Sequence, residues 1–287
     1  MTPPASPAAP LRADCIGDSA GGLTFDVAAR GNTGAALLIL RRRTADATDT
    51  GEDAAEGAAE DTVSLPLAPA AEGRLRAALP SSVSLPEGRW DAYARLSGGD
   101  PRRLVPGVTD LRSLAERTPG GLLGHVAVRI PYATRRGHLT VRSWLRAPHA
   151  EAVDLSVASG GLTVRGRVYG TRLLPGAHAE LRARPDADRG GQGPGARLLD
   201  VTAVGTEFAF TAPYDGLAPG DWDLWLRPAG APGPAVRLAR LLDDIADKHP
   251  LLTGRRTRVE TPYGPAEAGP YYTRDNDLSL AVTPLEA

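Results

Sequence analysis

The chain contains the same short sequence blocks twice, in the same order. Gly88–Arg95 (GRWDAYAR) recurs as Gly220–Arg227 (GDWDLWLR), with Trp, Asp and Arg at matching places. A second pair, Pro131–Arg135 (PYATR) and Pro270–Arg274 (PYYTR), is separated by 139 residues, against 132 residues for the first pair. A period of this length is that of a whole domain rather than of a solenoid repeat. We therefore expect an internal duplication of one fold.

The 287 residues are enough for two domains of similar size, each with its own core. We place the first domain at residues 11–147 and the second at residues 152–287. Each has a low-complexity stretch after the same strand, an acidic loop at 44–61 and a Gly-rich loop at 185–196, which we interpret as solvated spacers. Residues 1–10 are rich in Pro and Ala and lack the features of a signal peptide, so we expect them to be disordered.

Apolar residues alternate with polar ones over short runs that Gly and Pro interrupt, a pattern that predicts β-strands. The runs are Leu23–Val27, Ala36–Leu40, Val63–Leu67, Val126–Ile130, Leu139–Val141, Leu162–Val164, Phe208–Phe210, Trp222–Leu226 and Leu278–Val282. Many short strands between turn signals are typical of antiparallel sandwiches. We predict an all-β protein of two tandem immunoglobulin-like β-sandwiches. Val236–Ala246 has leucines at helical spacing and predicts one or two turns of helix.

The charge and cysteine content narrow the class of protein. A formal net charge of −1 gives no overall field for nucleic acid, and no apolar run is long enough to span a membrane. Every base except Lys248 is an arginine, which suits contacts with carboxylate and phosphate, although a GC-rich codon bias also explains it. The single cysteine, Cys15, cannot form an intrachain disulfide. We expect a soluble, cytoplasmic protein.

The repeated strand predicts a candidate ligand-binding face in each domain. Alternate side chains of a strand point to opposite faces, so the Trp of each block belongs to the core face. The opposite face carries an acid, an aromatic ring and an arginine: Asp91, Tyr93 and Arg95 in the first domain, and Asp223, Trp225 and Arg227 in the second. Aromatic rings stack on sugars, while arginines bind hydroxyl and phosphate groups. The alternatives are an aromatic corner and a contact between the domains.

The second repeated block precedes a turn in each domain. Its Thr and Arg side chains either brace the turn or present the Arg to an anionic partner. Tyr271, Tyr272 and Arg274, together with the basic run Arg255–Arg258, make the second domain the better candidate for binding an anionic polymer such as a polyol phosphate.

Gly88–Arg95 and Gly220–Arg227 resemble the segment that enters strand F of immunoglobulin-like domains. With the later Thr-Arg turn and Leu-Ser, they are similar to accessory β-sandwich domains appended to actinobacterial glycosyltransferases of cell-wall polymer (teichoic-acid-type) synthesis. The resemblance implies a non-catalytic accessory or binding module. Its ligand would be a glycan or an anionic cell-wall polymer, and its partner protein a glycosyl- or polyol-phosphate transferase. A structural or protein-interaction scaffold is the alternative.

Three groups of residues are candidates for catalysis or metal binding. Gly17–Gly21 matches the G-x-S-x-G of a nucleophile elbow around Ser19, but no helix is predicted to follow, so we interpret it as a turn. Asp-x-Asp triplets, which hold divalent cations in nucleotide-sugar transferases, occur at 186–188, 221–223 and 275–277. The five histidines have no ligand spacing, and we expect them at the surface or in turns. We predict no catalytic residue, cofactor or metal; an enzyme would most readily be a transferase, with a Ser hydrolase as the other possibility.

Overall fold

The computed structural model describes residues 9–29, 31–32, 34–43, 61–115, 125–185, 196–249 and 255–285. This part of the chain is nearly all β, which confirms the predicted class; its helical segments include the four-residue α1 (Arg112–Ala115) and the 3₁₀ helix η2 (Ala71–Gly73). No helix in it is both long and apolar enough to cross a membrane. The chain divides into two compact units, called here unit 1 (1–118 and 127–145) and unit 2 (119–126 and 146–287).

The segments predicted to be disordered or solvated fall mostly outside the described residues. These are residues 1–8 of the N-terminal stretch, 44–60 of the acidic loop and 186–195 of the Gly-rich loop. The first of the three Asp-x-Asp triplets, 186–188, is therefore also outside the described part.

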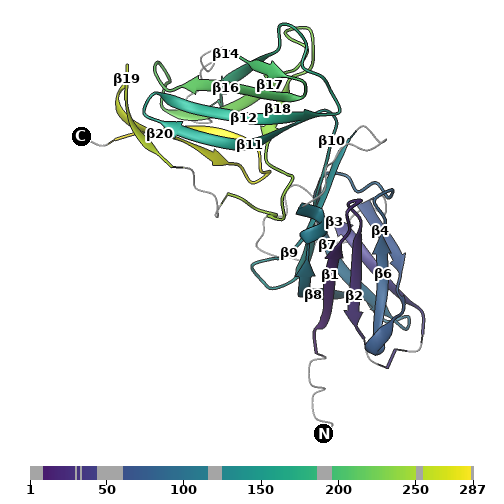
Figure 1. Cartoon of the computed structure of the whole chain (residues 1–287). Coiled ribbons are helices and arrows are strands. Elements are labelled where there is room, and N and C mark those ends of the chain that lie inside the picture. The colour runs from purple at the N-terminus through teal and green to yellow at the C-terminus, as the bar shows by residue number, and fades with distance from the viewer. Residues whose placement is uncertain are drawn as a thin grey trace. The chain divides into compact units, whose positions relative to one another are not determined.

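Unit 1 is built on one mixed sheet in the order β4-β3-β7-β8-β1-β2-β6-β5, with β10 beside β7 and β9 beside β10 (Figure 1). The strands are β1 Leu11–Gly17, β2 Leu23–Ala28, β3 Ala36–Arg42, β4 Thr62–Pro66, β5 Ala68–Pro69, β6 Arg74–Leu79, β7 Gly88–Leu96, β8 Arg102–Asp110, β9 Val126–Ala133 and β10 Leu139–Arg146. β8 is parallel to β1 and antiparallel to β7, so it joins the two halves of the sheet.

Unit 2 is also built on one mixed sheet, in the order β15-β16-β12-β11-β18-β17-β21-β20-β19, with β13 beside β17 and β14 beside β13. The strands are β11 His149–Ala158, β12 Gly161–Tyr169, β13 His178–Ala183, β14 Arg197–Asp200, β15 Thr202–Val204, β16 Glu207–Pro213, β17 Gly220–Arg227, β18 Val236–Ala239, β19 Thr257–Thr261, β20 Gly264–Tyr272 and β21 Leu278–Pro284.

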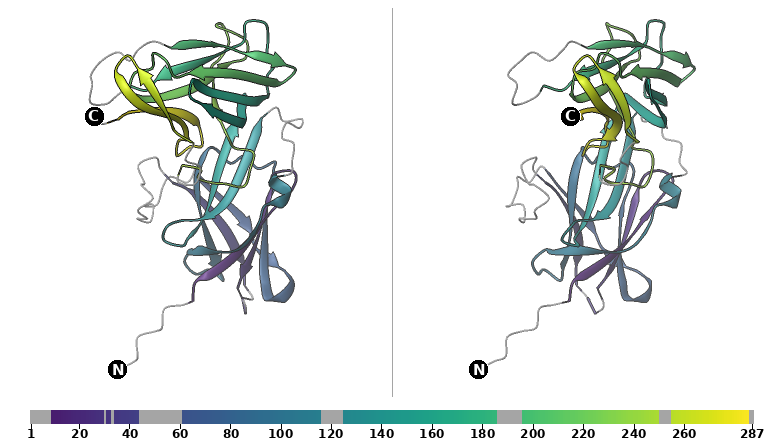
Figure 2. Two further views of the ribbon diagram at one scale, coloured as in Figure 1. Left: turned by 60° about the vertical axis from the view of Figure 1, so that its left-hand side comes forward. Right: turned by 90° about the vertical axis from the view of Figure 1, so that its left-hand side faces the viewer.

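The strand pairings of the two units follow one scheme. In unit 1, β7 pairs with β3 along its length, with β10 at its start and with β8 at its end. In unit 2, β17 pairs in the same way with β13, β21 and β18. The parallel pair β1–β8 corresponds to β11–β18, and the hairpin β9–β10 corresponds to the hairpin β20–β21. In Figure 2, β9–β10 is teal and β20–β21 is yellow. Among the described residues, β19 has no counterpart in unit 1.

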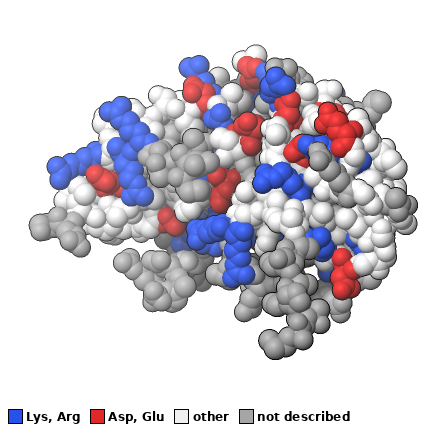
Figure 3. Space-filling model, turned by 90° about the horizontal axis from the view of Figure 1, so that it is seen from below, with Lys and Arg blue, Asp and Glu red and all other residues white. Residues whose placement is uncertain are grey.

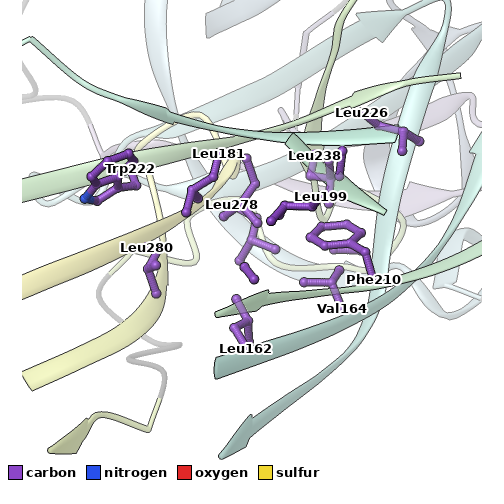
Figure 4. Packing of buried hydrophobic residues seen from close by; sticks show 14 of the residues in the cluster. Leu162, Val164, Leu181, Leu199, Phe210, Trp222, Leu226, Leu238, Leu278 and Leu280 are labelled. Carbon is purple, nitrogen blue, oxygen red and sulfur yellow. The ribbon is translucent and has the colours of Figure 1, made fainter. Parts of the chain in front are cut away.

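The predicted core faces of the repeated strands are confirmed. Trp90, Ala92 and Ala94 are buried in unit 1, as are Trp222, Leu224 and Leu226 in unit 2. In each unit the indole Nε1 donates a 3.0 Å hydrogen bond to the carbonyl four residues earlier, of Pro86 and of Ala218. Figure 4 shows Trp222 among the side chains that fill the interior of unit 2, including Leu181, Leu199, Phe210, Leu238 and Leu280.

The helix predicted at Val236–Ala246 is wrong. Its first four residues form strand β18, and residues 240–249 follow without helix or strand. The leucines at helical spacing instead lie in a segment without regular structure. Two backbone N–H groups of this segment bind an acceptor that is far away in the sequence. Leu241 and Leu242 donate their backbone N–H groups to the carboxylate of Glu151, in strand β11.

Candidate functional site

The face of β7 opposite the core holds a buried carboxylate between two arginines. Arg43 donates from Nε to Asp91 Oδ1 at 2.9 Å, and Arg103 Nη1 lies 2.6 Å from Oδ2. The Thr140 hydroxyl of β10 donates to Asp91 Oδ1 at 2.8 Å. Burial alone would raise the pKa of Asp91, but the hydrogen bonds from Arg43 and Arg103 lower it overall. Asp91 therefore stays ionised and ties β3, β7, β8 and β10 together.

The corresponding face of β17 contains the same arrangement. Arg184 donates to Asp223 Oδ1 at 2.5 Å, Arg237 Nη1 lies 3.0 Å from the same oxygen, and the Ser279 hydroxyl donates at 3.0 Å. Burial would raise the pKa of Asp223, but Arg184, Arg237 and Ser279 together lower it. The Asp223 side chain is 22% exposed, against 9% for Asp91, so more water reaches the second cluster.

The aromatic ring next to each carboxylate lies between two guanidinium groups. The Cζ atoms of Arg41 and Arg103 are each 5.0 Å from the centroid of Tyr93. In unit 2, Arg182 and Arg237 approach Trp225 to 4.6 and 5.2 Å. The arginines come from the strands on the two sides of the aromatic residue, so they approach the ring from both sides. A sugar could stack on either ring only after a guanidinium group had moved away.

The two faces differ at the residue opposite the aromatic ring. In unit 2, Glu180 lies opposite Trp225 and binds Arg182 Nε at 2.7 Å and Arg227 Nε at 2.6 Å. Burial would raise the pKa of Glu180, but these two arginines lower it. In unit 1 the residue opposite Tyr93 is Ile39. The two arginines that the sequence predicted as ligand contacts therefore have different surroundings. Arg227 is bound by the Glu180 carboxylate, whereas Arg95 is exposed.

The second repeated block forms matching turns. The Thr134 hydroxyl accepts the His138 N–H at 3.1 Å, and the Thr273 hydroxyl accepts the Asp277 N–H at 3.2 Å. Each Thr therefore braces its turn, through backbone N–H groups rather than carbonyl oxygens. Arg274, at the tip of the second turn, is exposed.

The two tyrosines of this block in unit 2 lie in different environments. The Tyr271 hydroxyl accepts a 3.2 Å hydrogen bond from Arg184, so this ring is joined to the Asp223 cluster. Tyr272 is buried, and burial raises its pKa to about 12. Of the tyrosines and arginine proposed from the sequence, only Tyr271 and Arg274 thus reach the surface.

The residues considered for catalysis and metal binding make hydrogen bonds and ion pairs within the fold, or are buried. Ser19 lies in the turn between β1 and β2, where Asp18 Oδ1 accepts the N–H groups of Ala20 and Gly22, as expected for a turn. Cys15 is buried, and burial raises its pKa to about 12, which keeps the thiol protonated. Both carboxylates of the 221–223 triplet are within 3.4 Å of Arg184.

The 275–277 triplet lies at the tip of the hairpin formed by β20 and β21. Asn276 has a φ of 60°, a left-handed conformation that Asn tolerates in tight turns. Asp277 Oδ1 accepts from Arg146 at 2.7 Å. Within the described ranges, no group of three His, Cys, Asp or Glu residues is placed to hold a metal ion.

A buried polar cluster in unit 2 was missed, and the prediction that every histidine lies at the surface or in a turn is wrong at His149, which is buried in strand β11. This ring is fully buried, and its Nε2 lies 2.7 Å from Glu151 Oε2. Close by in the fold, the fully buried Lys248 donates to Asp243 Oδ1 at 2.7 Å, and burial lowers the pKa of its amine. The His-x-Glu spacing on a strand was the available signal, because alternate residues share a face. Glu151 accepts the backbone N–H groups of Leu241 and Leu242, which gives the cluster a structural role.

No family model matches this chain, and no curated protein matches it.

Proposed function

We propose that the two units are tandem immunoglobulin-like β-sandwiches that arose by duplication. Their common pairing scheme supports this, as do the identical hydrogen bonds of Trp90 and Trp222. The clusters around Asp91 and Asp223 add a more specific similarity: in each, two arginines and one hydroxyl come from corresponding strands.

We further propose that the chain is a non-catalytic accessory module of a glycosyl- or polyol-phosphate transferase of cell-wall glycopolymer synthesis in the cytoplasm. The module would bind the anionic polymer. The observation that carries the proposal is the arginine-framed face, present once in each unit (Arg41 and Arg103, Arg182 and Arg237). Guanidinium groups stay charged and bind phosphate bidentately. The resemblance of the repeated blocks to transferase-appended domains supports the choice of partner.

A scaffold without a ligand is the second candidate, and one observation favours it. Tyr93 is only 7% exposed, and the carboxylates beside both rings are bound by arginines. Such clusters hold strands together and need no ligand. On the face drawn in Figure 3, blue and red side chains lie close together, as expected for a surface rich in ion pairs.

Titration of the full chain with poly(glycerol phosphate), poly(ribitol phosphate) and a neutral glycan separates these functions. The module predicts saturable binding of a polyol phosphate that weakens as salt is added, because counterions screen the phosphates. The neutral glycan is the control for non-ionic contacts. An absence of binding to both phosphate polymers at low salt would leave the scaffold as the better account.

A further inference from the structure

The two corresponding sheet faces differ in charge. In unit 1, Arg41, Arg89 and Arg95 lie on the outer face of β3 and β7. Among the described residues, none of these three side chains pairs with a carboxylate or donates a hydrogen bond, and the Arg41 guanidinium group lies over the Tyr93 ring.

In unit 2 the corresponding positions are neutralised. Arg182 corresponds to Arg41, because they lie opposite Asp223 and Asp91, and it is bound by Glu180. Arg227, which corresponds to Arg95, is bound by the same Glu180.

The third position carries the opposite charge. Asp221 stands in unit 2 where unit 1 has Arg89, because each precedes the shared Trp of its block by one residue. Its Oδ2 accepts a 3.4 Å hydrogen bond from Arg184. Two differences, Ile39 for Glu180 and Arg89 for Asp221, therefore account for the three unneutralised arginines of unit 1.

The positions of these arginines suit an extended anion. Arg89 and Arg95 are six residues apart on one face of β7, a separation of about 20 Å in an extended strand. Arg41 lies between them, opposite Asp91. A row of this length exceeds a single phosphate and matches a chain of phosphates.

Given the proposed function, on which this inference rests, we propose that the outer face of β3 and β7 in unit 1 binds the phosphodiester groups of a polyol-phosphate polymer. Arg41, Arg89 and Arg95 are the contacts. This places the anion site in unit 1 rather than on Tyr271, Tyr272 and Arg274 of unit 2. A nucleic acid fits less well, since the aromatic ring on this face, Tyr93, is buried beneath guanidinium groups and offers no surface for base stacking.

The test exchanges the residue that distinguishes the two faces. Ile39→Glu gives unit 1 the carboxylate that binds both arginines in unit 2; Ile39 and Glu180 are equally buried, each 5% exposed. Ile39→Leu is the matched control, and thermal unfolding of each variant checks that the fold is kept. We expect Ile39→Glu to weaken binding of poly(glycerol phosphate) about tenfold or more, as for the loss of contacts between charged groups. Ile39→Leu should bind as the wild type does.

A second probe, inorganic polyphosphate, separates the site from the proposed function. If the wild type binds polyphosphate and Ile39→Glu abolishes that binding, the site is supported even when poly(glycerol phosphate) does not bind. In that case the proposed function fails and the site stands. Folded Ile39→Glu that binds polyphosphate as tightly as the wild type overturns the site. Single-stranded DNA of matched charge tests the choice of polymer. If the wild type binds this DNA as tightly as poly(glycerol phosphate), and Ile39→Glu loses that binding too, the choice of polymer is overturned.

Discussion

The outer faces of β7 in unit 1 and β17 in unit 2 share one ion cluster and differ in what surrounds it. Asp91 and Asp223 each bind two arginines and a hydroxyl from corresponding strands. Beside this common centre, Glu180 neutralises two arginines in unit 2, whereas Ile39 leaves their counterparts without a carboxylate. The common part holds the sheet together, and the variable part sets the charge that the face presents.

The largest expected effect comes from removing the shared carboxylate. Asp91→Asn leaves Arg43 and Arg103, both largely buried, without their anion, so we expect a loss of about 3–5 kcal/mol in the free energy of unfolding. Asp223→Asn should cost less, about 1–3 kcal/mol, because that cluster is more exposed. Urea unfolding measures both, with tryptophan fluorescence as the signal. An equal or larger loss for Asp223→Asn would contradict the ranking.

Acid titration of stability tests the same carboxylates. The pKa values of Asp91 and Asp223 are lowered in the folded state, so their contribution is present above the unfolded-state pKa of about 4 and is lost as the pH falls through the folded values. We expect the free energy of unfolding to fall below about pH 4 in the wild type and to fall less steeply in Asp91→Asn. Parallel curves for the two proteins would mean that Asp91 is not the group that titrates.

The next effect concerns a position where the units differ. Glu151 pairs with Ala239 in the parallel strands β11 and β18, and Arg12 has the equivalent position in the parallel strands β1 and β8. Of these two residues, Glu151 is the one that binds backbone N–H groups, those of Leu241 and Leu242. Glu151→Gln replaces one acceptor oxygen by a donor, so we expect a loss of about 1–3 kcal/mol and faster amide exchange at Leu241 and Leu242. Arg12→Ala, at the exposed counterpart, should change stability by less than about 0.5 kcal/mol. Unchanged amide exchange in Glu151→Gln would argue against its role in this segment.

The smallest effect is expected at the matching turns. Thr134→Val removes a hydroxyl that accepts one backbone N–H, and Thr273→Val removes one that accepts two, from Asp275 and Asp277. Each contact contributes about 1 kcal/mol, so urea unfolding should give a loss of about 1 kcal/mol for Thr134→Val and a loss at least as large for Thr273→Val. A loss in one variant only would mean that the turns, although alike in geometry, do not contribute alike.

Local patterns in the sequence predicted much of the fold. Alternation located strands such as β2, β17 and β21, and it assigned Trp90 and Trp222 to the core face, because both depend on neighbouring residues alone. The ion clusters could not be predicted, since Arg43 and Thr140 reach Asp91 from 48 and 49 residues away. The wrong helix at Val236–Ala246 has the same cause: the acceptor for its N–H groups, Glu151, is 90 residues distant from Leu241.

The most direct measurement of the difference between the faces is poly(glycerol phosphate) binding by the double variant Ile39→Glu, Glu180→Ile, compared with the wild type and with Ile39→Glu alone. We expect Ile39→Glu to weaken binding and the added Glu180→Ile to restore part of it. In the double variant, the polymer should slow amide exchange in β13 and β17 instead of β3 and β7. If the folded double variant binds the polymer with wild-type affinity, and amide exchange is still slowed in β3 and β7, the proposed difference between the faces is wrong.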